Sequence, residues 1–219
     1  MRTFAYAWVL LLGVVGWPSA YAQEDTPAQV LADLVTPTEQ QDKRLAKDEV
    51  DALCGKIAKK LASVSFAECA GIPYLPPRFY SVNGLPILEA HYEAGEDQRQ
   101  KKPIRVLFLG GIHGDEYSSV SVTYKWLNTL NIHHSGAFDW LFVPLVNPDG
   151  LLKARSTRTN ANQIDLNRNF DVAEGVAEPV KHWQNSTTKR ARYYPGESPL
   201  SEPESRVVHQ LIDEYKPTV

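Results

Sequence analysis

The hydrophobic positions of the chain form two kinds of pattern, continuous runs and runs at helical spacing. Continuous apolar runs occupy residues 104–111 (IRVLFLGG) and 139–146 (DWLFVPLV), and each is typical of a buried strand. Between them, residues 118–130 carry apolar positions at helical spacing: Val122, Trp126, Leu127 and Leu130. Strand, loop, helix and strand in this order predict an α/β fold with a mixed, mostly parallel sheet flanked by helices.

Shorter signals lie on either side of this unit. Residues 79–92 (FYSVNGLPILEAHY) place two strand-forming runs around Asn83-Gly84, a strong hairpin signal. Pro86 favours an edge strand there, because proline cannot donate to a neighbouring strand. Residues 147–150 (NPDG) are interpreted as a turn that closes the second strand.

The first 22 residues have the layout of a secretory signal. Arg2 precedes an apolar run over residues 4–17, and the pattern AYA at residues 20–22 comes before a polar stretch. We expect cleavage after Ala22 and an exported chain, either periplasmic or secreted. The alternative is an uncleaved membrane anchor, although the apolar run is shorter than the ~20 residues that a spanning helix needs. After cleavage, no stable membrane insertion is expected.

The rest of the chain has an ordinary composition for one folded domain. It has 219 residues, 43% hydrophobic and 22% charged, with a formal net charge of −3 and both signs mixed along the sequence. Such a charge pattern indicates neither a nucleic-acid partner nor an anionic membrane surface. Residues 23–49 are polar and are interpreted as a linker or an exposed helix, and organised structure is expected over residues 50–219.

The chain contains two cysteines, Cys54 and Cys69. An exported protein folds in an oxidising compartment, so a disulfide between them is favoured over two free thiols. The paired C-x-x-C units of cysteine metal sites are absent, and the intervening segment carries apolar residues at helical spacing. The predicted bond is therefore a structural link and carries no chemistry.

The candidate chemistry begins directly after the first strand, where His113 and Glu116 stand three positions apart. Imidazole and carboxylate are both good zinc ligands, and a glycine-rich loop at a strand end can turn both inward. In open α/β sheets, ligands bind beyond the carboxyl ends of the strands, which is where this pair and the NPDG segment lie. The alternative reading is an exposed pair on a loop. Asp115, between the two, is either a partner that orients His113 or a turn residue.

A polar loop rich in arginine and asparagine follows the second strand, over residues 155–170 (RSTRTNANQIDLNRNF). Arginine presents a planar donor fork that can bind a carboxylate at two points, and asparagine adds neutral donors. The residues concerned are Arg155, Arg158, Arg168, Asn160, Asn162, Asn167 and Asn169. The loop is suited to gripping a carboxylate, and the alternative is a solvated loop of turns and caps.

Three segments in this order, GGIHGDE, NPDG and NANQIDLNRNF, resemble the zinc metallocarboxypeptidases of the carboxypeptidase A type. The resemblance is closest to the bacterial branch that includes the murein peptide amidases, and it covers about residues 80–219. It implies the fold of that family and a zinc cofactor, Zn²⁺. Residues 50–219 would then form the N-terminal part of its catalytic domain.

The resemblance also implies roles for single residues. His113 and Glu116 match the two zinc ligands of the H-x-x-E pair. Arg158 matches the arginine that polarises the scissile carbonyl. Asn167 and Arg168 match the pair that binds the terminal carboxylate of the substrate.

The third zinc ligand of the family is a histidine on a strand that follows the helix predicted over residues 201–215. That helix is expected to open with a capping box, Ser201 to Glu204, and to bury Val207, Val208, Leu211 and Ile212. The other histidines are interpreted as surface or helix-flank residues: His91, His133, His134, His182 and His209. We therefore expect a chain cut inside a catalytic domain, before the third ligand and the general base, and inactive as it stands.

Together these observations predict a zinc-dependent hydrolase of a peptide or amide bond next to a free carboxylate, acting on peptides, most plausibly those of the cell wall. One alternative is a zinc deacylase of N-acyl amino acids, which shares a histidine–acid pair and an Asn-Arg pair. The NPDG segment favours the peptidase. The other alternative is a non-catalytic module that binds carboxylates without zinc.

Overall fold

The computed structural model describes residues 37–171 and 179–219, and the residues from Gln40 onward form one compact unit. The secretory signal predicted over residues 1–22, and the polar stretch up to residue 36, lie outside the described residues. In the part that is described, no helix combines the length and the apolar character needed to cross a membrane.

The described residues form a three-stranded sheet in the order β1-β3-β2. Its strands are β1 (Ala90–Tyr92), β2 (Arg105–Leu109) and β3 (Asp139–Val143). β2 pairs with β3 in parallel, and β1 pairs with β3 antiparallel. The predicted mixed α/β fold is confirmed, with one parallel and one antiparallel pairing among these strands.

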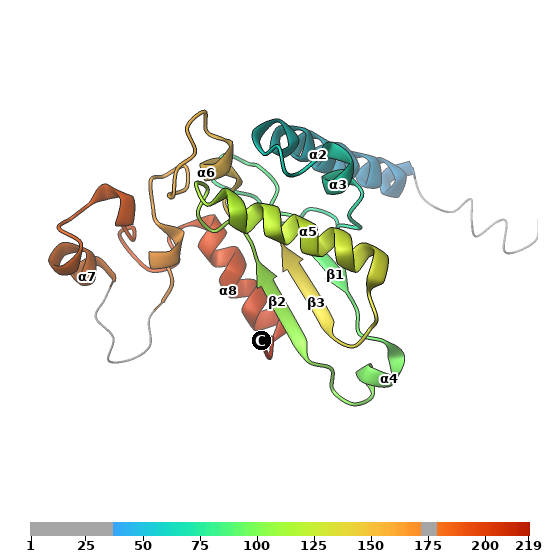
Figure 1. The fold of residues 1–219 in the computed structure, drawn as a ribbon. Helices are drawn as coiled ribbons and strands as arrows, with labels where there is room; N and C mark the ends of the chain where they lie inside the picture. The colour runs from blue at the N-terminus through green and yellow to red at the C-terminus, as the bar shows by residue number, and fades with distance from the viewer. Residues whose placement is uncertain (1–36, 172–178) are drawn as a thin grey trace, which may run out of the picture. The chain divides into compact units, whose positions relative to one another are not determined.

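Helices cover both faces of this sheet (Figure 1). On one side lies α5 (Tyr117–His133), and on the other lies α8 (Pro203–Tyr215). Successive residues of a strand point to opposite faces, so Phe142 joins a core with α5 while Leu141 and Val143 join a second core with α8. The strands are therefore held between two apolar layers, and the carboxyl ends of the parallel strands β2 and β3 lead into the loops that carry the candidate site.

α5 confirms the helix predicted from the spacing of Val122, Trp126, Leu127 and Leu130. Its buried residues are Val120, Thr123, Tyr124 and Leu127. Of the residues that marked the helical spacing, Leu127 is therefore in the core, whereas Val122 and Trp126 are 51% and 46% exposed. Apolar residues lie on both sides of this helix, so their spacing predicts the helix but does not say which side meets the core. Trp126 packs at the margin instead, with its ring centroid 5.0 Å from that of Phe108.

α2 (Pro37–Lys60) and α3 (Phe66–Ala70) are joined by a disulfide between Cys54 and Cys69, whose Cα atoms lie 5.5 Å apart. α2 begins at Pro37, so residues 37–49 are helical, which is one of the two alternatives for the polar stretch before Val50. α3 begins with a capping box in which Ser65 and Glu68 each accept from the other's backbone N–H.

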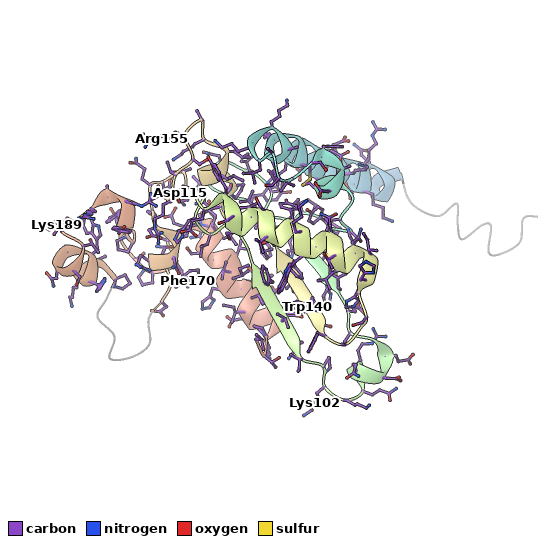
Figure 2. The ribbon with its side chains drawn as sticks, viewed as in Figure 1. Lys102, Asp115, Trp140, Arg155, Phe170 and Lys189 are labelled. Carbon is purple, nitrogen blue, oxygen red and sulfur yellow. A yellow bond between two sulfur atoms is a disulfide. The ribbon has the colours of Figure 1, made fainter. Side chains whose placement is uncertain are left out.

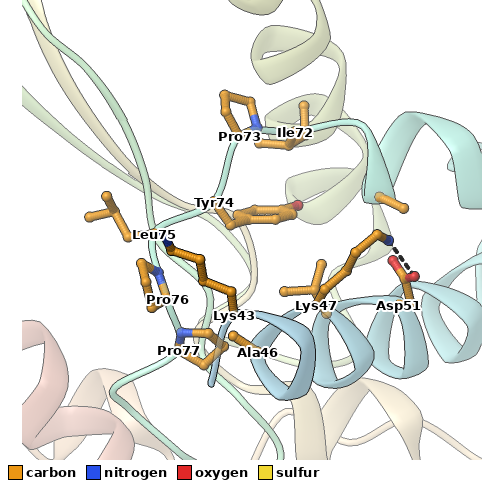
Figure 3. A pocket seen from close by; sticks show the side chains of 12 residues that line it. Lys43, Ala46, Lys47, Asp51, Ile72, Pro73, Tyr74, Leu75, Pro76 and Pro77 are labelled. Carbon is orange, nitrogen blue, oxygen red and sulfur yellow. Dashed lines mark hydrogen bonds and ion pairs between the residues drawn. The ribbon is translucent and has the colours of Figure 1, made fainter. Parts of the chain in front are cut away.

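A groove of about 330 Å³ lies between α2 and the segment of residues 72–77 (Figure 3). Ile72, Tyr74 and several prolines line it, and Lys47, paired with Asp51 at 2.5 Å, stands along one wall. None of the residues predicted to carry chemistry lines this groove.

The remaining short elements belong to the loops. They are α4 (Glu96–Arg99), α6 (Pro148–Leu152), the 3₁₀ helix η1 (Leu166–Arg168), α7 (Pro179–Ser186) and the 3₁₀ helix η2 (Ala191–Tyr193). Two predictions need correction here. The NPDG segment begins α6, with Asn147 as its N-cap. The hairpin keeps its turn, with Gly84 at φ +74°, but its strands shrink to a single bridge between Tyr80 and Pro86.

The predicted capping box at the start of α8 is also wrong. The N-cap is Glu202, and no side chain caps the helix. The hydroxyl of Ser201 donates to Glu202, and Glu204 is turned away to accept from Asn160 and from the backbone N–H of Val82. Both side chains that the capping box would need are therefore hydrogen-bonded to other groups.

Candidate metal centre and carboxylate site

The loops after β2 and β3 are fastened to each other. The N–H of Asn147 donates to the carbonyl of Gly111 at 3.0 Å, and Gly111 has φ +58°, a conformation that favours glycine. Gly114 approaches Gly150 so closely that an added Cβ would lie 2.1 Å from the carbonyl carbon of Gly150. The GGIHGDE and NPDG segments are therefore in backbone contact beyond the carboxyl ends of the parallel strands.

His113 is buried, and its two ring nitrogens face two carboxylates. Nε2 lies 3.1 Å from Oδ1 of Asp165, and Nδ1 lies 2.8 Å from Oε1 of Glu116. Because a carboxylate only accepts, the hydrogen bond to Asp165 requires a proton on Nε2. In the neutral ring this leaves a lone pair on Nδ1 facing the Glu116 carboxylate. Two acceptor atoms at this separation need a cation between them, either a proton or a metal ion.

Asp165, which is completely buried, fixes the orientation of the His113 ring. Burial acts to raise its pKa, but hydrogen bonds from His113 and Arg158 lower the pKa below its ordinary value. Its Oδ1 also accepts from the backbone N–H of Asn167 at 3.2 Å. An ionised Asp165 therefore holds the proton of His113 on Nε2 and directs Nδ1 toward Glu116.

Sequence reasoning did not single out Asp165. The available signal was its place at the start of DLNRNF, one residue before η1, where it caps the turn. Asp115, for which both an orienting role and a turn role were open, does not contact His113 in the structure. It accepts instead from Nη1 of Arg192 at 2.7 Å.

Arg158 completes the cluster. Its Nε donates to Oδ2 of Asp165 at 2.8 Å, and its Nη1 lies 3.4 Å from Oε1 of Glu116. The guanidinium carbon lies 5.5 Å from the ring centroid of Tyr193, and the side chain is 12% exposed. The structure thus brings His113, Glu116 and Arg158 together, as the predicted roles require, with Arg158 positioned through the same aspartate as His113.

Asn167 and Arg168 lie on η1 and are exposed. Arg168 donates from Nη1 to the carbonyl of Asn167 at 3.0 Å, and no ion pair involves its guanidinium among the described residues. The pair is therefore joined to the His113 cluster only through the backbone bond from Asn167 to Asp165. Donors of Arg168 remain open to a ligand.

The other asparagines of the loop bind groups within the protein. Asn160 and Asn162 both donate to Glu202, and Asn169 donates to the carbonyls of Pro195 and Ser198. These residues do grip carboxylate and carbonyl oxygens, but the oxygens belong to the start of α8 and the loop before it. Their role is to anchor the loop that holds Asp165 and Arg158.

Glu204, at the start of α8, is completely buried, and burial raises its pKa. It accepts from Asn160 at 3.0 Å and from the backbone N–H of Val82 at 3.1 Å. The buried carboxyl group thereby links α8, the polar loop and the hairpin turn.

No third metal donor joins His113 and Glu116 within the described residues. These residues contain no group of three His, Cys, Asp or Glu side chains placed to hold a metal ion. Three of the other histidines have partners elsewhere: His91 pairs with Asp139, His134 with the carbonyl of Glu93, and His209 with Asp213. His133 ends α5, and His182 lies in α7.

Comparison with known proteins agrees with this geometry. Residues 80–219 match the zinc carboxypeptidase family, and the chain belongs to that family. It is 40% identical over 117 residues to murein peptide amidase A of Escherichia coli (strain K12), covering 51% of this chain and 45% of that protein. It is 32% identical over 158 residues to carboxypeptidase B of Helicoverpa zea, covering 62% of this chain and 34% of that protein. The chain thus spans about half the length, or less, of the curated relatives it matches.

Among solved structures, the carboxypeptidase A from Helicoverpa armigera aligns with a TM-score of 0.52 and 25% identity, covering 66% of this chain and 38% of that one. The family that the sequence motifs indicated is therefore confirmed, and so is its fold.

A zinc ion fits the donors that are present. Histidine nitrogen and glutamate oxygen are both zinc ligands, and Nδ1 of His113 and the Glu116 carboxylate converge with a lone pair facing a negative charge. Asp165 provides the carboxylate partner that metal-binding histidines normally have on their other nitrogen. The set supplies two donors, whereas a catalytic zinc normally takes three.

Proposed function

We propose that this chain is part of a zinc-dependent hydrolase that cleaves a peptide or amide bond next to a free carboxylate. The observation that carries the proposal is the convergence of His113 Nδ1 and Glu116 at 2.8 Å, with Asp165 bound to the opposite nitrogen of the same ring. Belonging to the zinc carboxypeptidase family supports it.

Each residue of the site has a separate role in the proposed reaction. His113 and Glu116 would hold the zinc ion, and the ion would supply a Lewis acid for hydrolysis of the scissile bond. Asp165 keeps the His113 ring oriented by accepting its Nε2 proton. Arg158, fixed by the same aspartate, presents positive charge beside the carbonyl oxygen and stabilises the negative charge that develops there.

The exposed Asn167 and Arg168 bind the terminal carboxylate of the substrate. The guanidinium of Arg168 has donors to spare, and an arginine fork can bind a carboxylate through two parallel hydrogen bonds. A substrate held in this way would be positioned by its end. This explains why the bond to be cleaved should lie next to a free carboxylate.

The substrate we propose is a peptide of the bacterial cell wall. The relative with 40% identity is a murein peptide amidase. The predicted export agrees with this assignment, because a cell-wall substrate lies outside the cytoplasm. The signal layout of residues 1–22 predicts a mature chain that begins at Gln23. The intact mass of the exported protein, before and after reduction, tests both the cleavage point and the Cys54–Cys69 disulfide.

With His113 and Glu116 as the only metal donors of the candidate site among the described residues, the 219-residue chain should bind zinc weakly and show no turnover, because two ligands neither hold nor place the metal adequately. The experiment is a zinc titration by calorimetry, with a hydrolysis assay on a diaminopimelate-containing peptide, on this chain and on a longer protein that contains it. We expect weak zinc binding without turnover in the first, and tight zinc binding with cleavage that a chelator abolishes in the second. Cleavage that persists after zinc removal would contradict the proposal.

A further inference from the structure

A polar cavity, separate from the groove of Figure 3, lies beside the candidate metal centre. It has a volume of about 230 Å³ and is lined by two kinds of side chain, arginines and hydroxyl groups. The lining residues are Arg155, Ser156, Thr157, Arg158, Thr159 and Arg192. The lining contains no acidic residue. The hydroxyls of Ser156 and Thr157 donate to backbone carbonyls, so the arginines are the donors that make the cavity suited to an anion.

Arg155 is the first open donor of this cavity. It is exposed, and in the part of the chain that the structure describes its guanidinium has neither a hydrogen bond nor an ion pair. Figure 2 shows Arg155 and Asp115 at the end of the sheet where α6 lies, far from Lys102 at the opposite end. The unpaired charge is therefore at the end of the molecule where the substrate would bind.

Arg192 is the second open donor, and it is held in place by the metal loop. Its Nη1 donates to Oδ2 of Asp115 at 2.7 Å, and this hydrogen bond raises the pKa of Arg192, which stays charged. The other oxygen of Asp115, Oδ1, is buried and has no partner among the described residues. Asp115 and the hydroxyl of Tyr193 therefore engage part of the guanidinium, and the other N–H donors of Arg192 are left for a ligand.

Arg158 differs from these two arginines, because two of its nitrogens face carboxylates of the candidate metal centre. Its Nε binds Asp165, and its Nη1 faces Glu116. The 3₁₀ helix η2 links the cavity to the candidate metal centre. Arg192 of η2 lines the cavity, and the neighbouring Tyr193 lies against the guanidinium of Arg158. The cavity is thus continuous with the proposed catalytic arginine, yet has donors of its own.

We propose that this cavity binds a second acidic group of the substrate, a carboxylate distinct from the one held by Asn167 and Arg168, and that Arg155 and Arg192 are its specificity-determining residues. The inference rests on the proposed function, because it assigns a substrate feature to the same site. The preferred substrate is then a peptide that carries one carboxylate at its end and another close to the bond that is cleaved.

The test compares two peptides that differ only in this second group, a free carboxylate in one and its amide in the other. Binding is measured by calorimetry on the full chain without zinc, so that the readout does not depend on hydrolysis. We expect the protein to bind the acidic peptide about tenfold more tightly, since charge-assisted contacts are worth about 1.5 to 3 kcal/mol. The preference should fall toward unity in Arg155→Gln and Arg192→Gln.

Arg190→Gln is the matched control, because Arg190 is an exposed arginine two positions away that does not line the cavity. It should keep the full preference. Arg192→Lys, which keeps the positive charge, should keep part of it, so a loss in Arg192→Gln alone cannot be ascribed to misfolding.

Equal affinity of the unmodified protein for the two peptides, or binding of neither, would overturn the inference. So would a preference that survives both glutamine substitutions. Cleavage of the peptides is measured separately, with zinc, on a longer protein that contains this chain. A binding preference in this chain without cleavage by the longer protein counts against the proposed function alone, whereas cleavage by the longer protein without a preference counts against the cavity alone.

Discussion

The two ends of the sheet each carry a histidine–aspartate pair, and among the described residues only one of these histidines has a second carboxylate facing its other ring nitrogen. At the carboxyl end of the parallel strands, Nε2 of His113 lies 3.1 Å from Asp165, and Nδ1 faces Glu116. At the amino end, Nε2 of His91 lies 2.8 Å from Asp139, which starts β3, and no partner of Nδ1 is described.

The surroundings of the two aspartates explain the difference. Asp165 is completely buried and is shared with an arginine, whereas Asp139 is shared with the hydroxyl of Tyr215 at 2.5 Å. The side chain of His113 is 5% exposed and that of His91 is 30% exposed. A histidine–aspartate pair alone therefore does not define a site. What defines it is a second acceptor facing the other nitrogen of the same ring.

The largest expected effect is on zinc affinity, and it should differ between substitutions of the two aspartates. Asp165→Asn should weaken zinc binding by roughly 10- to 100-fold in a protein with a complete ligand set, because the amide no longer holds the His113 ring as the carboxylate does. Asp139→Asn should leave zinc affinity unchanged. Calorimetric titration of both variants checks this. Equal losses would show that the aspartates act through general stability.

A smaller effect is expected from the arginines at the two ends. Arg168→Ala should reduce affinity for a substrate with a free terminal carboxylate by roughly tenfold or more, with much less effect on the amidated substrate, because a charge-assisted contact is lost. Arg105, whose guanidinium carbon lies 5.9 Å from the Tyr215 ring centroid at the other end, is the matched control. Arg105→Ala should not distinguish the two substrates. An equal loss of affinity for both substrates in Arg168→Ala would contradict the proposal that Arg168 binds the terminal carboxylate.

The smallest effect concerns stability at low pH. Burial acts to raise the pKa of Asp139, but hydrogen bonds from Tyr215 and His91 lower it below the ordinary value. A depressed pKa means that ionised Asp139 stabilises the folded state above the unfolded pKa of about 3.9, and that this contribution is lost as pH falls through the lower folded value.

Asp139→Asn should therefore reduce the free energy of unfolding by about 1 kcal/mol at neutral pH. The difference from the unmodified protein should shrink below about pH 4. Urea unfolding at a series of pH values measures it. A difference that stays constant down to pH 2 would contradict the assignment of the charge to Asp139.

The sequence predicted the parts of the fold whose signals are local. β2 and β3 lie within the two continuous apolar runs, and α5 lies between them as the helical spacing indicated. The spacing does not fix the buried face of α5, because apolar residues occur on both of its sides and only packing against the rest of the protein decides which side is inside.

The candidate site was predictable to the extent that motifs name residue types in order. His113, Glu116 and Arg158 were identified, and the structure places them together. Asp165 was missed because its role depends on a contact across 52 positions of sequence, which spacing does not reveal. Asn160 and Asn162 were assigned to the ligand-binding loop, but their partners lie on α8, which local sequence could not indicate.

The central claim is that Nδ1 of His113 is the metal-binding nitrogen and that Nε2 stays protonated against Asp165. Nitrogen NMR of the histidine rings during zinc addition tests it most directly, because the two nitrogens of each ring report separately. We expect zinc to shift Nδ1 of His113, to leave its Nε2 protonated, and to leave both nitrogens of His91 unchanged. A shift at Nε2 of His113, or at His91 in its place, would contradict the account.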